Sequence, residues 1–322
     1  MTLVRHVGNP IITRVHIPAL SPHFTDVTSV FNPGAVRRDG AVHLMLRVQS
    51  RGRETALVMA RSRDGVAFTP AREAVRFDGI ERLGERLFHV YDPRMTVLDD
   101  TVYIMFAADT ERGCRLGLAR SQDLVAFEFV ALDDAGDVRN GVLFPQRFGD
   151  NYLRLDRPNR LALTAGPTSG DEIMLSRSAD LVHWEAVGPV MRGRPHAWDE
   201  RIGSGPPPVK TRDGWLHLYH GVATHFASTN VYQAGVVLLD LDDPTRVIAR
   251  GRNNVLEPRE PYELVGQVPN VVFPSGMIVE RVDDDGYAEP DSRVLLYYGA
   301  ADTVVGLATS TVADLLAACR LT

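Results

Sequence analysis

The sequence predicts an all-β protein, a five-bladed β-propeller, from three observations. The 322 residues contain almost no long helical pattern, and short β-prone runs are broken by Gly, Pro, Asp and Asn. A proline followed by a polar turn and then an apolar strand recurs five times. Units of about 60 residues, each with room for about four strands, are typical of propeller blades. Residues 1–322 are therefore expected to form one domain.

The five repeats follow one another at nearly even spacing. Their prolines lie 60, 52, 62 and 67 residues apart: Pro33, Pro93, Pro145, Pro207 and Pro274. They lead in order to the apolar segments 42–46, 102–106, 161–163, 215–219 and 294–298. We expect these segments to be the innermost strands, with the residues just before them at the mouth of a central cavity, where propellers bind ligands.

A Ser-x-Asp turn followed by an aromatic residue marks the first three repeats. These turns lie at 62–64, 121–123 and 178–180, and a degenerate copy ends near residue 310. We expect the turns to build the blades, and Trp184 and Trp215 to be core residues. At the chain ends, residues 1–30 are expected to form an N-terminal extension, and residues 311–320 a short C-terminal helix with Val312, Leu315, Leu316 and Cys319 on one face.

Composition narrows the class of protein. With 44% hydrophobic residues, global disorder is excluded, and no apolar run approaches a membrane span. Arginine outnumbers lysine 34 to one, but arginines alternate with acids at a net charge of −6, which argues against nucleic-acid binding. No signal peptide is evident, and Cys114 and Cys319 are the only cysteines, so a cytoplasmic protein without disulfides or a zinc site is expected.

Asp92 is the candidate catalytic residue. It stands between Tyr91 and Pro93 at the expected cavity mouth. A carboxylic acid in a partly dry cavity can have a raised pKa and serve as a general acid. The alternative is that Asp92 only caps a turn.

Basic residues gather near the same mouth in the repeat register. They are Arg47, Arg94, Arg139, Arg157, Arg201 and His220. Arg47 and His220 end equivalent strands of the first and fourth repeats, so they are expected to face one channel. Several guanidinium groups converging without matching acids would form an oxyanion site, although any one of them can instead make a surface salt bridge. Asp302, which follows the fifth strand, can accept hydrogen bonds from two sugar hydroxyls.

Eight short motifs, in order from about residue 9 to residue 310, resemble glycoside hydrolase family 130. They include Phe31-Asn32-Pro33-Gly34, Asp92-Pro93-Arg94, Asn140-Gly141-Val142-Leu143-Phe144-Pro145, Tyr219-His220-Gly221-Val222 and Tyr297-Tyr298-Gly299-Ala300-Ala301-Asp302. Members of this family are five-bladed propellers and mostly β-mannoside phosphorylases, which need no metal or organic cofactor and use inorganic phosphate as co-substrate.

The resemblance also implies residue roles. Asp92 matches the general acid, whose proton is thought to pass through the mannose 3-hydroxyl. Residues matching the mannose-binding subsite are Asn32, Arg47 and Asp302; those matching the phosphate site are Arg139, Arg157, Arg201 and His220, with Asn140 beside them. Tyr91 and Arg94 flank the acid and are expected to contact substrate. Tyr91 stands where the family commonly has an acid, and Arg201 where it often has lysine.

The implied reaction is inverting phosphorolysis of a terminal β-mannosidic bond, giving α-mannose 1-phosphate. An inverting glycosidase needs two carboxylates, one as acid and one as base for the water. A phosphorylase needs only the acid, because phosphate is already a charged nucleophile that a set of basic residues can position and screen. Two alternatives remain: a β-1,2-mannosidase that uses water, and a non-catalytic sugar-binding propeller. The linkage and acceptor sugar are left open, with loops 51–55, 77–89 and 224–232 as candidate determinants. A homo-oligomer is possible.

Overall fold

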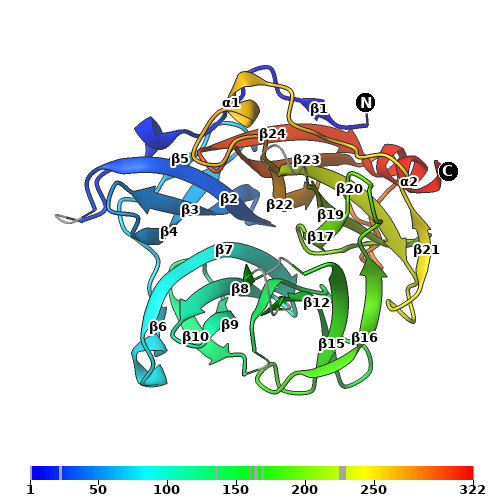
Figure 1. Cartoon of the computed structure of the whole chain (residues 1–322), viewed down its shortest axis with the longest axis horizontal. Helices are drawn as coiled ribbons and strands as arrows, with labels where there is room; N and C mark the ends of the chain where they lie inside the picture. The colour runs from blue at the N-terminus through cyan, green and yellow to red at the C-terminus, as the bar shows by residue number, and fades with distance from the viewer. Residues whose placement is uncertain are drawn as a thin grey trace.

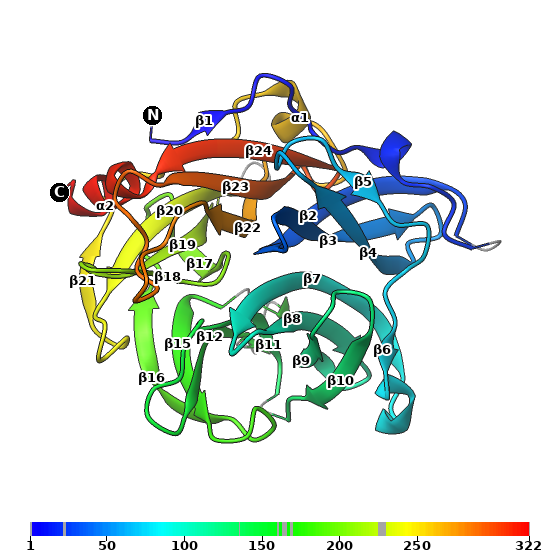
Figure 2. The same ribbon diagram turned by 180° about the vertical axis from the view of Figure 1, so that it is seen from behind.

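The computed structural model describes residues 2–21, 24–134, 136–159, 161–162, 166–167, 170–224 and 230–321. Five sheets surround a central axis, and the chain builds them in sequence order (Figures 1 and 2). The predicted five-bladed β-propeller is confirmed.

The first three blades come from the N-terminal half of the chain. Blade one consists of β2 (Val27–Arg38), β3 (Ala41–Ser50), β4 (Thr55–Ser62) and β5 (Thr69–Pro70). Blade two consists of β7 (Leu87–Leu98), β8 (Thr101–Thr110), β9 (Gly113–Ser121) and β10 (Phe127–Leu132), with β6 (Phe77–Asp78) parallel to β10. Blade three consists of β11 (Val138–Leu143), β12 (Tyr152–Pro158), β15 (Glu172–Ser178) and β16 (Glu185–Arg192).

The last two blades complete the ring. Blade four consists of β17 (Arg201–Ser204), β19 (Gly214–Ala223), β20 (Val231–Leu239) and β21 (Val247–Arg250), with β18 (Val209–Thr211) also paired to β19. Blade five consists of β22 (Val272–Val279), β23 (Arg293–Ala300), β24 (Val304–Thr311) and β1 (Val4–Arg5). The remaining elements are the ribbon β13 (Leu161–Ala162) and β14 (Gly166–Pro167), the 3₁₀ turns η1 (Arg14–His16) and η2 (Ile80–Leu83), and the helices α1 (Pro261–Leu264) and α2 (Val312–Arg320).

The expectation for the innermost strands is wrong by one strand. The apolar segments 42–46, 102–106, 215–219 and 294–298 lie in the second strand of each sheet, and the prolines before them lie in or beside the first strand. Proline lacks an N–H donor and is rare inside a sheet, but a β-bulge accommodates it in these first strands. The pairing register shifts between Phe31 and Gly34 and between Tyr91 and Arg94, at Pro33 and Pro93.

Blade three departs further from the prediction. Its second strand is β12, whereas Leu161 and Ala162 pair only with β14 in a separate two-stranded ribbon. Leu163 lies outside the described residues. The polar residues within Arg154-Leu155-Asp156-Arg157 concealed this strand, because Arg154 and Asp156 are buried as an ion pair rather than exposed.

The Ser-x-Asp turns are structural elements of the blades. In each turn one carboxylate oxygen of the Asp accepts hydrogen bonds from two backbone N–H groups that follow it, as Asp64 does from Val66 and Ala67 at 2.8 and 2.9 Å. These bonds lower the pKa of Asp64 to about 2. Asp123 and Asp180 repeat the pattern.

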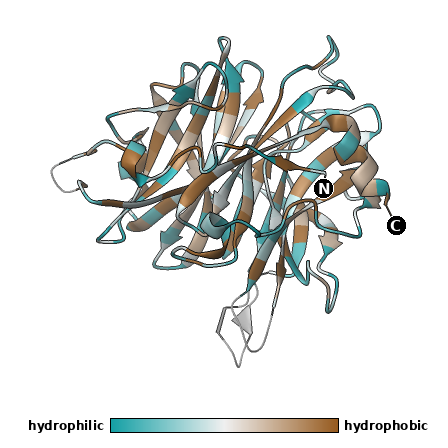
Figure 3. Ribbon diagram, turned by 90° about the horizontal axis from the view of Figure 1, so that it is seen from above, coloured by the Kyte–Doolittle hydropathy of each residue, from teal (hydrophilic) through white to brown (hydrophobic). Residues whose placement is uncertain are grey.

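Trp215 is fully buried against Phe144, whereas Trp184 is half-buried under the guanidinium of Arg154. Figure 3 shows that apolar residues are concentrated in the strands and polar residues in the loops that connect them.

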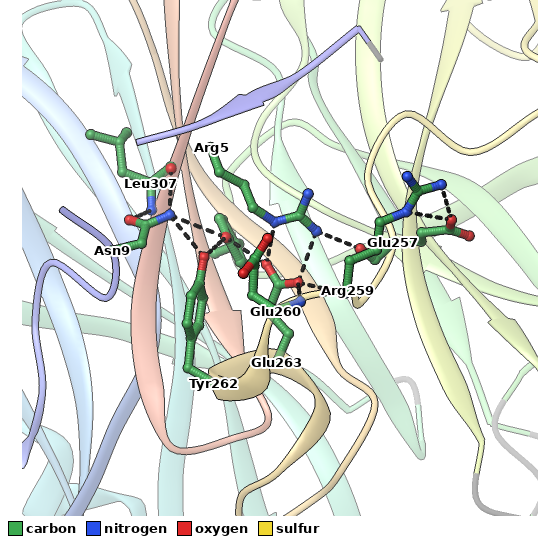
Figure 4. A network of polar contacts seen from close by, with 9 residues as sticks. Arg5, Asn9, Glu257, Arg259, Glu260, Tyr262, Glu263 and Leu307 are labelled. Carbon is green, nitrogen blue, oxygen red and sulfur yellow. Dashed lines mark hydrogen bonds and ion pairs between the residues drawn. The ribbon is translucent and has the colours of Figure 1, made fainter. Parts of the chain in front are cut away.

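The N-terminal segment completes blade five instead of extending from the propeller. β1 pairs with β24, and the Arg5 guanidinium donates two hydrogen bonds of 2.8 Å to the buried carboxylate of Glu263 (Figure 4). Asn9 bonds both the N–H and the C=O of Leu307 at 2.9 Å. The predicted C-terminal helix is present as α2, capped by the Thr311 side chain. Among the described residues, no helix is long and apolar enough to span a membrane.

Candidate active site

A cavity of about 340 Å³ lies at the centre of the ring, and all five blades contribute to its wall. The residues that line it are Asn32, Arg47, Tyr91, Asp92, Ala107, Asp109, Arg139, Asn140, Arg157, His220, Tyr232, Val268, Val271, Phe273 and Asp302. Nine of these fifteen side chains were singled out from the sequence. A concave site with convergent charged groups on a rigid scaffold is the usual form of a small-molecule site.

The β-bulges of the first strands aim polar side chains into this cavity. Asn32, Asp92 and Asn140 occupy equivalent bulge positions in blades one, two and three, with φ of 47°, 52° and 53°. Positive φ is costly for most L-residues, but Asn and Asp tolerate it. The same requirement therefore accounts for the Asn/Asp identity of these positions and for their convergence.

The second strands add a matching ring of side chains. In blades one to three the residue just before each bulge pairs with a residue of the second strand: Phe31 with Arg47, Tyr91 with Ala107 and Arg139 with Arg157. In blade four, whose first strand has no bulge, Gly203 pairs with His220 on β19. The expected equivalence of Arg47 and His220 is thus confirmed, although they lie on second strands rather than innermost ones.

Asp92 is held by two donors in the cavity wall. Its Oδ1 accepts hydrogen bonds of 2.9 Å from Asn32 Nδ2 and from Arg47 Nη1. Burial raises the pKa of Asp92, but the charges of Arg47 and Arg94 and these hydrogen bonds outweigh it, and the pKa lies below its ordinary value. The expectation of a raised pKa is therefore wrong for the free protein, because sequence spacing does not reveal which cations touch the carboxylate.

The raised carboxyl pKa in the cavity belongs to Asp302. Burial is the main cause that raises the pKa of Asp302 to about 6. The charge of Asp92 raises this pKa further, and the charge of Arg47 lowers it. Arg47 thus serves both carboxylates. Two carboxyl groups with pKa values pushed in opposite directions are a common feature of catalytic sites.

The opposite wall is basic and partly unpaired. Arg139 Nε, Arg157 Nε and Asn140 Oδ1 are buried and find no hydrogen-bond partner among the described residues. Burial, and then the charge of Arg139, lower the pKa of Arg157 to about 10, so both arginines are cationic at neutral pH. Unsatisfied buried polar atoms are rare in folded proteins, and a group of them facing a cavity indicates a polar ligand.

His220 does not add charge to this wall. Burial, followed by the charges of Arg157 and Arg94, lowers the pKa of its imidazole well below the usual value, so it is neutral at pH 7. The sequence-based grouping of His220 with the cations therefore needs correction: it offers a neutral ring nitrogen. A Cβ placed on Gly203 would approach this ring and Asn140 Oδ1 within 2.7 Å, so the glycine leaves room beside them.

Comparison with known proteins identifies the family. Residues 3–321 match the family model described as beta-1,4-mannooligosaccharide phosphorylase, which spans nearly the whole chain. The chain belongs to glycoside hydrolase family 130. The resemblance seen in the sequence motifs is therefore confirmed.

Relatives in family 130 differ in the linkage that their names specify. The chain is 33% identical to a 1,2-beta-oligomannan phosphorylase of Thermoanaerobacter sp., over 89% of this chain and 91% of the relative. It is 32% identical to a beta-1,4-mannooligosaccharide phosphorylase of Ruminococcus albus, over 97% and 89% of the two chains. The structure of beta-1,2-mannobiose phosphorylase from Listeria innocua superposes with a TM-score of 0.84 at 26% identity, covering 99% of each chain.

Two residues predicted from the family pattern lie outside the described cavity wall. Arg94 is 1% exposed; its Nε donates to the Gly205 carbonyl at 2.7 Å and its Nη1 to the Asp92 carbonyl at 3.1 Å. It thus fixes the bulge that carries Asp92, which is a positioning role. Arg201 begins β17 opposite Val222 and is half-buried.

Several lining residues were not predicted from the sequence. Asp109, Tyr232 and Phe273 belong to the wall. Tyr232 ends the candidate loop 224–232, and Phe273 lies next to Pro274 in a segment expected at the cavity mouth, whereas no sequence signal pointed to Asp109. Residues 225–229 of that loop lie outside the described residues. Of the other two loops, Thr55 and His89 approach each other, with 3.5 Å between Oγ1 and Nδ1.

Proposed function

We propose that this protein is an inverting β-mannoside phosphorylase that cleaves a terminal β-mannosidic bond with inorganic phosphate, giving α-mannose 1-phosphate and a shortened saccharide. The observation that carries the proposal is the pair Arg139 and Arg157, which line the cavity and whose buried Nε atoms have no hydrogen-bond partner among the described residues. The membership of family 130 supports the same reaction.

The basic wall supplies what a phosphate nucleophile needs. Arg139 and Arg157 screen the charge of the phosphate, since guanidinium groups match oxyanion geometry. Asn140 and the neutral His220 add hydrogen bonds. Phosphate needs no deprotonation to attack C1, so no second catalytic carboxylate is required on this side.

The acidic wall holds the mannose and handles the proton. Asn32, Arg47 and Asp302 bind sugar hydroxyls, and Asp92 delivers a proton toward the leaving oxygen, through the 3-hydroxyl as in the family mechanism. Asp92 is ionised in the free enzyme, so it must take up this proton as the complex forms. That proton comes from solvent and ends on the leaving sugar as the C1–O bond to that sugar breaks and the C1–O bond to phosphate forms. The sugar phosphate product then releases the proton that hydrogen phosphate carried, so the proton count balances.

The decisive experiment incubates the enzyme with β-1,2- and β-1,4-mannobiose, with and without phosphate, and follows the products by ³¹P NMR. We expect α-mannose 1-phosphate from at least one substrate and little free mannose without phosphate. Equal cleavage with and without phosphate would make the protein a mannosidase, and no cleavage of any β-mannoside would make it a binding protein.

Both cysteines are buried and free, and we place the enzyme in the cytoplasm.

A further inference from the structure

Asp109 lines the cavity but has no part in the mechanism above. It lies on β8, two residues beyond Ala107 and on the same face of the strand. Ala107 occupies the position where blades one, three and four place Arg47, Arg157 and His220. Because alanine ends at a methyl group, blade two leaves space where blades one, three and four carry long side chains, and Asp109 borders that space.

Tyr91 orients the Asp109 carboxylate. The Tyr91 hydroxyl donates a hydrogen bond of 2.8 Å to Asp109 Oδ1 and lies 3.4 Å from Cys114 Sγ. Burial is the main reason that the pKa of Tyr91 lies far above its ordinary value, so the phenol keeps its proton and remains a donor. Tyr91 is the one described residue that hydrogen-bonds this carboxylate, which leaves acceptor capacity for a ligand.

The position of Asp92 indicates which part of the substrate would meet Asp109. In the proposed function the phosphate occupies the wall of blades three and four, and inversion places the leaving group on the far side of C1 from the nucleophile. Asp92, which supplies the proton for the leaving oxygen through the mannose 3-hydroxyl, also lies away from the phosphate wall, in blade two. The leaving sugar therefore extends along blade two, where Asp109 and the space beside Ala107 lie.

We propose that Asp109, oriented by Tyr91, accepts hydrogen bonds from hydroxyl groups of the leaving sugar and helps to determine which saccharide the enzyme accepts. This inference rests on the proposed phosphorylase function. Asp109 has a competing role: its negative charge also acts on Arg139, which would make it a counter-ion of the phosphate site. Loss of the first role would weaken binding of the acceptor sugar, whereas loss of the second would weaken binding of phosphate or mannose 1-phosphate.

The test is the reverse reaction, with α-mannose 1-phosphate as donor and mannose, glucose, N-acetylglucosamine and mannobiose as acceptors. For Asp109→Asn and Asp109→Ala we expect the acceptor KM to rise about tenfold or more, with an altered ranking of acceptors and an unchanged donor KM. Tyr91→Phe should shift the acceptor KM the same way by a smaller factor, with little change in kcat, as befits a positioning residue. Asp100→Asn is the control: Asp100 is exposed at the opposite end of the β8 hairpin, and its φ of 59° suits Asn.

Each outcome decides the proposal. An unchanged acceptor KM overturns it, and so does a change confined to the donor KM or to the phosphate KM of the forward reaction, which would assign Asp109 to Arg139. If the wild-type enzyme makes no product with any acceptor, the proposed function fails. Calorimetric titration of wild-type protein and Asp109→Asn with the two mannobioses then still decides whether Asp109 binds sugar, and equal affinities would refute it.

Discussion

Arg47 donates a hydrogen bond of 2.9 Å from its Nη1 to Oδ1 of Asp92. The same guanidinium lies between two aromatic rings, 4.5 Å from the centroid of Phe31 and 4.6 Å from that of Tyr91. The stacking restricts the arginine to one orientation, and its charge lowers the pKa of both Asp92 and Asp302. One side chain therefore connects the candidate acid, the sugar-binding carboxyl and the leaving-sugar side of the cavity.

Replacing Arg47 separates its charge from its geometry. Arg47→Gln should raise the pKa of both carboxyl groups, so the limb of the kcat/KM pH profile that reports them should move to higher pH. Arg47→Lys keeps the charge but loses the planar stacking, so it should leave the limb near its wild-type position while the mannoside KM rises. Identical pH profiles for Gln and Lys would contradict the electrostatic role.

Asp92→Asn tests the candidate acid with little disturbance of the backbone. Asn keeps the shape of the side chain and tolerates the φ of 52° at this bulge, so the fold should remain. Without the carboxyl group, we expect kcat for phosphorolysis to fall by about 10²–10⁴-fold. Thermal unfolding measured alongside activity provides the control, and near-normal turnover would remove Asp92 as the acid.

Arg157→Ala should weaken phosphate use selectively. Loss of a charged hydrogen bond typically costs about 1.5–3 kcal/mol, which corresponds to a rise in phosphate KM of about 10–150-fold. The mannoside KM should change much less, since the sugar contacts come from other blades. Initial rates over a matrix of phosphate and mannoside concentrations separate the two constants, and a larger effect on the mannoside would reverse the assignment of the two walls.

Gly203→Ala perturbs the phosphate wall without removing any of its groups. The new Cβ would lie 2.5 Å from a His220 ring carbon and 2.6 Å from Asn140 Oδ1, so these side chains must move. We expect a rise in phosphate KM of about tenfold with a smaller effect on mannoside KM. Gly188→Ala is the matched control, because nothing lies within 4 Å of its new Cβ. Similar kinetics for the two variants would show that Asn140 and His220 do not bind phosphate.

The sequence predicts two parts of the site: residues with a local backbone signature, and residues such as Arg47 and His220 that the repeat register places in equivalent strands. Asn32, Asp92 and Asn140 were recognisable because a bulge that needs positive φ selects Asn or Asp next to Pro or Gly. Asp109 has no such signature: it follows an apolar strand, and only the β7–β8 pairing brings it to Tyr91. The directions of the pKa shifts could not be predicted from the sequence either, because the low pKa of Asp92 depends on the nearby charges of Arg47 and Arg94.

Asp302 makes stability depend on pH in a direction opposite to that of most carboxyl groups. Its pKa is about 6 in the folded protein, against about 3.9 for an unfolded aspartate. The protonated form therefore favours folding; this contribution is complete below about pH 4 and is lost as pH rises through about 6. Asp302→Asn keeps a neutral side chain at every pH and tolerates the φ of 49°. We expect this variant to match wild-type stability near pH 4 and to exceed it at pH 8 by up to about 3 kcal/mol. Urea unfolding without substrate at both pH values measures the difference. If the variant is no more stable than wild type at pH 8, the ionised carboxylate of Asp302 does not destabilise the fold.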